Sequence, residues 1–96
     1  MTDLLLGIDI GTTNIKAVLA TPTGRIIAQA QNDYPIHYPQ PGWAEQDPAD
    51  WWRGVVTVTR VVLAQAAVQS DQVVGIGVSG QGCAVTLIDA AGEVVR

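Results

Sequence analysis

The chain has 96 residues, of which 48% are hydrophobic, and this is enough for the core of one small globular domain. A net charge of −4 with only five Lys and Arg residues argues against a nucleic-acid partner, which needs clustered basic side chains. The acidic amino terminus lacks the basic segment of a signal peptide. Arg60 interrupts the longest apolar run, which argues against a membrane-spanning segment. The single cysteine fits a reducing compartment. We therefore expect a cytoplasmic protein with no membrane partner.

Residues 4–10 are apolar and partly β-branched, which predicts a buried strand, but Asp9 places a carboxylate near its end. A carboxylate in a core strand needs a compensating cation or hydrogen-bond donors. The polar turn 11–14 follows, and residues 15–20 predict a second strand. Backbone amides and threonine hydroxyls in such a turn bind anions, and Asp9 would then be an outer ligand of a hydrated Mg²⁺. The alternative is that Asp9 only caps the turn.

Residues 21–24 carry Pro and Gly at the positions typical of a type I turn, so residues 25–31 predict a third strand and complete an antiparallel three-strand meander. Residues 32–46 contain three prolines and predict an irregular segment that packs on the domain through its aromatic side chains. A ligand role for His37 in this segment is open, but the lack of a second ligand at metal spacing favours a solvated loop histidine.

A helix is predicted over residues 48–69, because Asp47 is a good N-cap and Pro48 suits the first helical position. The β-branched run 55–62 alternates enough to resemble a strand instead. The cap, the length and the second half, rich in Ala and Gln, favour the helix.

Residues 72–79 predict a fourth strand, which the helical crossover should place parallel to the first. It contains the pattern G-x-G-x-x-G at Gly75, Gly77 and Gly80, which is typical of dinucleotide-binding proteins only where a strand ends and a helix begins. Within a strand, these glycines favour close approach of the backbone to a helix or ligand. Residues 84–89 predict a fifth strand and residues 90–93 a turn into a last one.

Three stretches in this order carry a family resemblance. The first is Asp-Ile-Gly-Thr-Thr at residues 9–13, followed by Lys16; the second is Gly-Trp-Ala-Glu-Gln-Asp-Pro-Ala-Asp-Trp-Trp at residues 42–52. The third is residues 75–81 running into residues 85–89. Together they resemble the FGGY carbohydrate kinases, which belong to the superfamily of acetate and sugar kinases, heat-shock chaperones and actin. The second stretch is similar to segments of glycerol kinases, xylulokinases and gluconokinases.

This resemblance implies an α/β fold, ribonuclease H-like, with a mixed sheet in which an antiparallel three-strand meander is joined through a crossover helix to a parallel fourth strand. It also implies transfer of the γ-phosphoryl group of ATP to a hydroxyl of a sugar or polyol. The resemblance implies that Asp9 binds Mg²⁺. It also implies that the phosphates of ATP are bound by Gly11, Thr12, Thr13 and Lys16, and the sugar by Gln81, Gly82 and Cys83.

FGGY kinases are several times longer, so we expect residues 1–96 to be the amino-terminal part of the first ribonuclease H-like domain of a two-domain kinase. The catalytic base and the adenine pocket are then expected beyond Arg96, and the 96 residues alone should be inactive and self-associate. Two other classes stay open: an actin- or chaperone-like ATPase whose output is a conformational change, and a non-catalytic interaction domain of the same fold.

The third stretch departs from its relatives at Gly82, Cys83 and Ala84. Xylulokinases usually carry Met-His-Gly there, and glycerol kinases an Arg-Glu pair in this region. A pocket without those donors and acceptors selects mainly by size, so we expect a ketose or polyol other than D-xylulose and glycerol to be preferred. Alternatively, these residues are only a turn and selectivity is set elsewhere.

Overall fold

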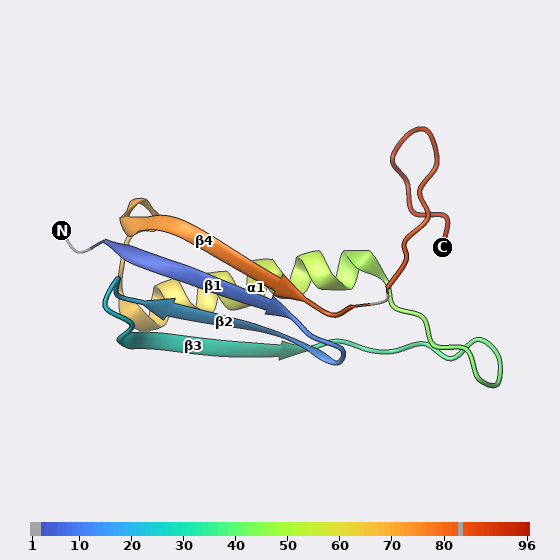
Figure 1. Ribbon diagram of the computed structural model, residues 1–96, viewed down its shortest axis with the longest axis horizontal. Helices are drawn as coiled ribbons and strands as arrows, with labels where there is room; N and C mark the ends of the chain where they lie inside the picture. Colours follow the sequence, from blue (N-terminus) through green and yellow to red (C-terminus); the bar gives the residue numbers. More distant parts are fainter. Residues whose placement is uncertain (1–2, 83) are drawn as a thin grey trace.

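Two layers make up the structure, a four-stranded sheet and one long helix that covers one of its faces (Figure 1). The computed structural model describes residues 3–82 and 84–96. Across the sheet, the strands are β3 (Ile26–Asp33), β2 (Asn14–Ala20), β1 (Leu4–Ile10) and β4 (Val73–Gly80), and the helix is α1 (Pro48–Ala66).

The predicted meander is confirmed, because β1 pairs with β2 and β2 with β3, both antiparallel. The third strand continues to Asp33, beyond the expected end at residue 31. It does so because β2 and β3 remain paired up to the turn 11–14. Asn14 lies opposite Asp33, and the amide of Tyr34 donates to the carbonyl of Thr13 at 3.1 Å. The sheet therefore supports the turn directly.

Helix α1 begins as predicted and ends earlier than predicted. The carboxylate of Asp47 accepts a hydrogen bond from the amide of Ala49 at 2.9 Å, which is an N-cap. The helix ends at Ala66 rather than at residue 69, because Ala67 adopts a left-handed conformation with φ 53°. The 3-10 turn η1 (Ser70–Gln72) then leads into β4.

The β-branched run 55–62 lies in the helix and not in a strand, and packing explains why. Gly54, Val58 and Val62 are buried at a spacing of four residues, which places them on one face of α1. A β-branched residue lowers helix propensity by at most about 0.7 kcal/mol. Burial of a valine side chain gains about 1.5–3 kcal/mol. The buried face therefore outweighs the local preference for a strand.

The fourth strand is parallel to the first, as the crossover predicts. Gly75 and Gly77 lie inside β4, opposite Leu5 and Gly7 of β1. The glycine pattern is therefore part of a strand, and in the described residues after β4 no helix follows it. This agrees with the interpretation that set the dinucleotide fingerprint aside.

The prediction of a fifth strand over residues 84–89 is wrong. This segment and the chain end form an irregular hairpin that projects beyond the sheet (Figure 1), with one isolated bridge between Ile88 and Val94. Val85 and Ile88 are exposed, so the apolar pattern that predicts a strand has no sheet to pack against here. Residues 87–89 bond through their backbone to residues 93–96 of the same hairpin, but this pairing is too short and irregular to form a strand.

The core lies between α1 and the sheet face formed by the alternate side chains of the strands. Its largest fully buried members are Leu4, Ile15, Leu19, Val58 and Val62. Helix α1 covers β2 and β3, whereas an apolar groove of about 500 Å³ stays open between α1 and β4. The opposite sheet face carries the exposed members of the same alternation.

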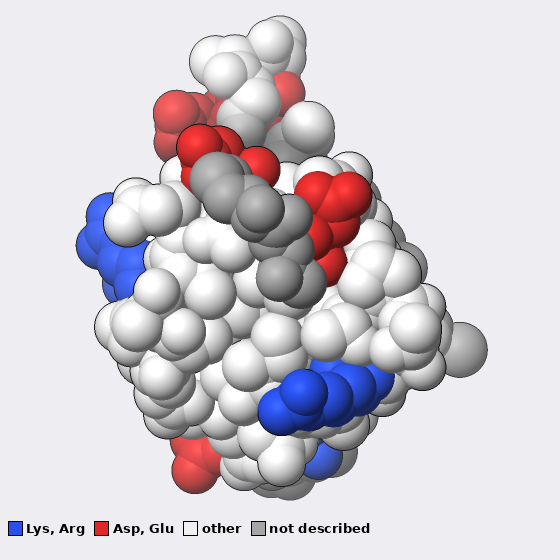
Figure 2. Space-filling view, turned by 90° about the vertical axis from the view of Figure 1, so that its left-hand side faces the viewer, with Lys and Arg blue, Asp and Glu red and all other residues white. Residues whose placement is uncertain are grey.

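Charged side chains of both signs are scattered over the end of the sheet where β1 begins (Figure 2). The turn 11–14 lies at the other end, together with the loop before α1 and the hairpin after β4 (Figure 1). Within the described residues, no helix combines the length and apolarity needed to cross a membrane.

Candidate functional site

The turn 11–14 is closed by its own backbone and presents two hydroxyl side chains to solvent. The amide of Gly11 donates to the carbonyl of Asn14 at 2.9 Å. A Cβ atom on Gly11 would lie 3.0 Å from that carbonyl oxygen, so the close approach of the chain to itself favours glycine. Thr12 and Thr13 are exposed, which leaves their hydroxyls accessible to a ligand.

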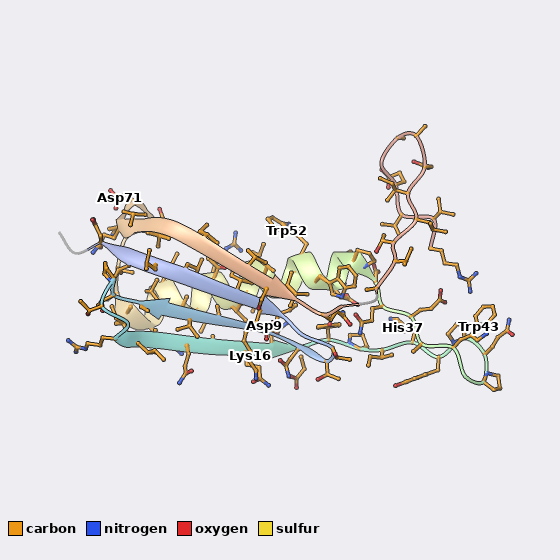
Figure 3. The ribbon with its side chains drawn as sticks, viewed as in Figure 1. Asp9, Lys16, His37, Trp43, Trp52 and Asp71 are labelled. Atoms are coloured by element: carbon orange, nitrogen blue, oxygen red, sulfur yellow. The ribbon has the colours of Figure 1, made fainter. Side chains whose placement is uncertain are left out.

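A carboxylate and an ammonium group flank this turn on one sheet face. Asp9 and Lys16 are direct cross-strand partners in the register of β1 and β2. Each is exposed and alternates with buried neighbours, so both lie on the face opposite α1. Figure 3 shows them towards the turn end of the sheet, whereas Asp71 lies at the opposite end. The structure thus brings together the predicted metal and phosphate residues.

Ser79, which was not predicted as a site residue, donates a hydrogen bond to Asp9. Its hydroxyl donates to Oδ1 of Asp9 at 2.9 Å, and the two residues are direct partners in the parallel pair of β1 and β4. A hydrogen bond to a carboxylate compensates part of its charge. The signal in the sequence is the small polar residue at the end of the predicted fourth strand, but finding it requires the register.

The residues expected to bind the sugar, Gln81, Gly82 and Cys83, follow the end of β4, and we call them the acceptor loop. The amide of Gln81 donates to the carbonyl of Ile10 at 2.8 Å, which extends the parallel ladder past Gly80. Gly82 is exposed, and a Cβ atom there would have no atom within 4 Å. Cys83 lies outside the described residues. Gln81 therefore comes close to the turn 11–14, and Gly82 faces open space.

The side chain of Gln46 joins three segments that are far apart in the sequence. Its Nε2 donates to the carbonyl of Thr12 at 2.7 Å. Its Oε1 accepts from Nε2 of Gln81 at 2.6 Å and from Nε1 of Trp51 at 3.0 Å. No sequence signal marked Gln46 as a site residue, although it lies within the stretch 42–52 that carries the family resemblance.

Tyr34 completes this cluster from the end of β3. Its hydroxyl donates to the carbonyl of Gly11 and lies 3.3 Å from both Oε1 of Gln46 and Nε2 of Gln81. Burial raises the pKa of Tyr34 above that of an ordinary tyrosine, and its side-chain hydrogen bonds oppose this. The hydroxyl is therefore protonated at neutral pH and able to donate. The residue was expected only to pack the loop, and at 7% exposure it does that as well.

A cavity of about 480 Å³ adjoins the cluster of Tyr34, Gln46, Trp51 and Gln81. Its wall includes Thr12 from the turn, Gln46, Trp51 and Gln81 from the cluster, and Thr86 from the hairpin. Polar groups from the turn and from the acceptor loop thus line the same space. A cavity of this size falls in the range of small-molecule sites.

The loop before α1 contains His37, which is exposed and pairs through its backbone with Glu45. Glu45 also forms an ion pair with Arg96 at 2.9 Å, and the guanidinium of Arg96 lies over the ring of Trp43. In the described residues no group of three or more His, Cys, Asp and Glu could enclose a metal ion.

Comparison with known proteins identifies the family. Residues 4–96 match the family described as "FGGY family of carbohydrate kinases, N-terminal domain". A glycerol kinase of Methylobacterium nodulans is 43% identical over 81 residues, which are 84% of this chain and 16% of that protein. The chain thus spans less than a fifth of the length of this relative.

Solved structures agree in fold. A xylulose kinase from Rhodospirillum rubrum superposes with a TM-score of 0.88 at 36% identity, over 97% of this chain and 19% of the kinase. A gluconate kinase from Lactobacillus acidophilus, at 23% identity, shows the fold alone, with a TM-score of 0.91 over all of this chain and 19% of the kinase. The mixed sheet is therefore part of a ribonuclease H-like domain, as expected. The chain belongs to the FGGY family of carbohydrate kinases.

Proposed function

We propose that the full-length protein transfers the γ-phosphoryl group of ATP to a hydroxyl of a sugar or polyol. The observation that carries this proposal is the pairing of Asp9 with Lys16 on one sheet face, beside a turn with two exposed threonines. Membership of a carbohydrate kinase family supports it. In this proposal residues 1–96 are the amino-terminal part of the first of two ribonuclease H-like domains, and the protein acts in the cytoplasm.

The turn 11–14 would hold the β- and γ-phosphates of ATP. The amides of the turn and the hydroxyls of Thr12 and Thr13 supply hydrogen-bond donors, and Gly11 allows the backbone to close without a side chain. Lys16 adds a positive charge on the same side of the sheet. Phosphoryl transfer depends mainly on positioning and charge neutralisation, which such a site provides.

Asp9 would hold Mg²⁺ as an outer ligand. Magnesium ions in kinases keep several water molecules and use one or two carboxylates together with phosphate oxygens. An exposed carboxylate that stands beside Ser79 and outside any acidic cluster of the described residues fits this pattern. The ion would neutralise the negative charge on the phosphates.

In the reaction, the acceptor hydroxyl oxygen forms a bond to the γ-phosphorus as the bond to the oxygen that bridges the β- and γ-phosphates breaks. The products are ADP and a sugar phosphate. The hydroxyl proton passes to a general base, which we assign to a part of the protein outside this chain. The 96 residues would therefore supply nucleotide positioning but not the complete reaction.

Gln81, Gly82 and Cys83 would face the acceptor. Gln81 lines the cavity that Thr12 also lines, and Gly82 faces open space. A pocket with few fixed donors selects mainly by size. We therefore propose that a ketose or polyol other than D-xylulose and glycerol is the preferred acceptor.

The test measures ADP release by the full-length protein with ATP, Mg²⁺ and a panel of ketoses, aldonates and polyols that includes D-xylulose and glycerol. At least one acceptor should raise ADP release well above the rate with ATP alone. Asp9→Asn should lower that acceptor-dependent rate by about 100-fold or more. Asp71→Asn, at the opposite end of the sheet, is the matched control and should behave as the wild type (Figure 3).

Two results would contradict the proposal. One is that no member of the panel raises ADP release. The other is that Asp9→Asn retains the wild-type rate. Preference for D-xylulose or glycerol would overturn only the proposal on acceptor choice.

A further inference from the structure

Gln46 occupies a fixed position between the two ligand-binding segments. It directly precedes Asp47, whose carboxylate caps α1, so its backbone is tied to the start of the helix. The indole of Trp51, one turn into α1, donates to its side chain at 3.0 Å. The side chain is half-buried. The helix therefore holds Gln46 from two sides.

The contacts of Gln46 determine which way its amide group points. The carbonyl oxygen of Thr12 can only accept, so the atom facing it at 2.7 Å must be Nε2. The indole nitrogen of Trp51 can only donate, so the atom facing it must be Oε1. Both assignments agree, and a flipped amide would leave two unfavourable contacts.

The same logic orients Gln81. Since Oε1 of Gln46 is an acceptor, the atom of Gln81 that lies 2.6 Å from it must be Nε2. That nitrogen also lies 3.3 Å from the hydroxyl of Tyr34. With its nitrogen engaged in the cluster, Gln81 retains its Oε1 as the acceptor for a ligand hydroxyl. One amide thus fixes both the turn 11–14 and the direction of the acceptor loop.

We propose that Gln46 is a positioning residue that holds the turn 11–14 and the acceptor loop at a fixed separation and orientation. This inference rests on the proposed kinase function. The rate of transfer between two bound substrates depends steeply on their relative placement, and a misplacement of about 1 Å can lower it about 100-fold. Gln46 acts on the rate through the two segments that it holds, the turn 11–14 and the loop that begins at Gln81.

The experiment uses the full-length protein with Gln46→Met and Gln46→Glu. Methionine has a similar length and removes every bond of the amide, whereas glutamate keeps acceptors for Trp51 and Gln81 and loses the donor to Thr12. Gln40→Met is the matched control, because Gln40 is exposed on the same loop. Kinetic constants are measured well below the melting temperature and per folded enzyme, so that a loss of stability does not contribute.

We expect kcat to fall about 10- to 100-fold in both Gln46 variants, with the KM values for ATP and acceptor changed by less than about threefold. Release of inorganic phosphate per sugar phosphate formed should rise, because the acceptor no longer meets the γ-phosphoryl group correctly. The effects of Gln46→Met and Gln81→Met on kcat should not add in the double variant. Gln40→Met should match the wild type.

A wild-type kcat in Gln46→Met would overturn the inference, and so would additive effects with Gln81→Met. A wild-type protein that shows no acceptor-dependent ADP release would instead refute the proposed function. Hydrogen exchange then decides the structural link on its own. Gln46→Met should speed exchange in the peptides covering residues 11–15 and 80–82, and unchanged protection there would overturn the inference.

Discussion

At Gly54, helix α1 packs closely on β2, the strand that leaves the turn 11–14, so Gly54→Ala tests how that strand is held. Gly54 is buried in α1, and a Cβ atom there would lie 2.5 Å from Cγ1 and 3.2 Å from Cβ of Ile15. Ile15 is 0% exposed and follows the turn directly. The substitution must therefore move the helix, the strand or the isoleucine side chain.

Two opposing effects decide the outcome. Alanine is favoured over glycine in a helix interior by about 1 kcal/mol. Carbon atoms pack at about 3.5–4.0 Å, so the new contact of Gly54→Ala with Ile15 is too short by about 1 Å. Overpacking of this kind costs about 1–3 kcal/mol. Since the β-branched Ile15 is stiff and fully buried, it cannot turn aside, and we expect the overpacking cost to lie at the upper end of this range, about 2–3 kcal/mol. After the gain in helix propensity is subtracted, the net destabilisation is about 1–2 kcal/mol.

The assay is thermal unfolding of the full-length protein, followed by calorimetry. Gly54→Ala should lower Tm, and Gly54→Ser should lower it further because serine is larger and a poorer helix former. Thr57→Ala places alanine at an exposed position of α1, where it makes no tertiary clash, and should leave Tm unchanged or raise it slightly. A Tm of Gly54→Ala equal to or above that of the wild type would refute the close packing of α1 on β2.

Three further predictions concern the turn, the cluster and the isolated chain. Thr12→Val and Thr13→Val should each lower kcat/KM for ATP by a factor that corresponds to about 1–3 kcal/mol of lost transition-state stabilisation, without changing the ranking of acceptors. Steady-state constants equal to the wild type would mean that the hydroxyls only stabilise the turn. Because burial raises the pKa of Tyr34 above that of an ordinary tyrosine, its neutral form favours the folded state, and the stability this provides is lost as the pH rises past about 10. Melting temperatures measured at rising alkaline pH should therefore fall less steeply in Tyr34→Phe than in the wild type, and equal slopes would contradict this. The isolated 96-residue chain should turn over no ATP. It should self-associate, because the groove between α1 and β4 exposes Trp52 at 68% and Ile76 at 64%. A monodisperse monomer in light scattering would contradict the predicted self-association.

Local signals in the sequence were sufficient for most of the fold. Alternation and turn residues identified the meander, and the pair Asp47 and Pro48 located the start of α1. The end of α1 was less predictable, because Ala67 takes a left-handed conformation that glycine would have signalled. Residues 84–89 have the pattern of a strand, but they pair only at their end with residues 93–96 and not with a strand of the sheet, which no local pattern reveals.

From local pattern alone, the candidate site was predictable only where its residues are contiguous, whereas Gln81 was expected from the family resemblance. Asp9 and the turn 11–14 form one short motif, so their association was apparent. Ser79 reaches Asp9 through the register of two strands that are 70 residues apart in the sequence. Gln46 and Gln81 meet through the docking of a loop onto the end of the sheet. Such contacts depend on tertiary structure, and residue types alone do not encode them.

The most direct test of the proposed function is the phosphorus NMR spectrum of a reaction of the full-length protein with ATP, Mg²⁺ and the acceptor that most increases ADP release. A carbohydrate kinase should convert ATP into ADP and a sugar phosphomonoester in equal amounts, and Asp9→Asn should leave the ATP signals intact over the same time. Formation of ADP with inorganic phosphate alone, whatever acceptor is present, would instead identify an ATPase and contradict the proposed phosphoryl transfer to a sugar or polyol.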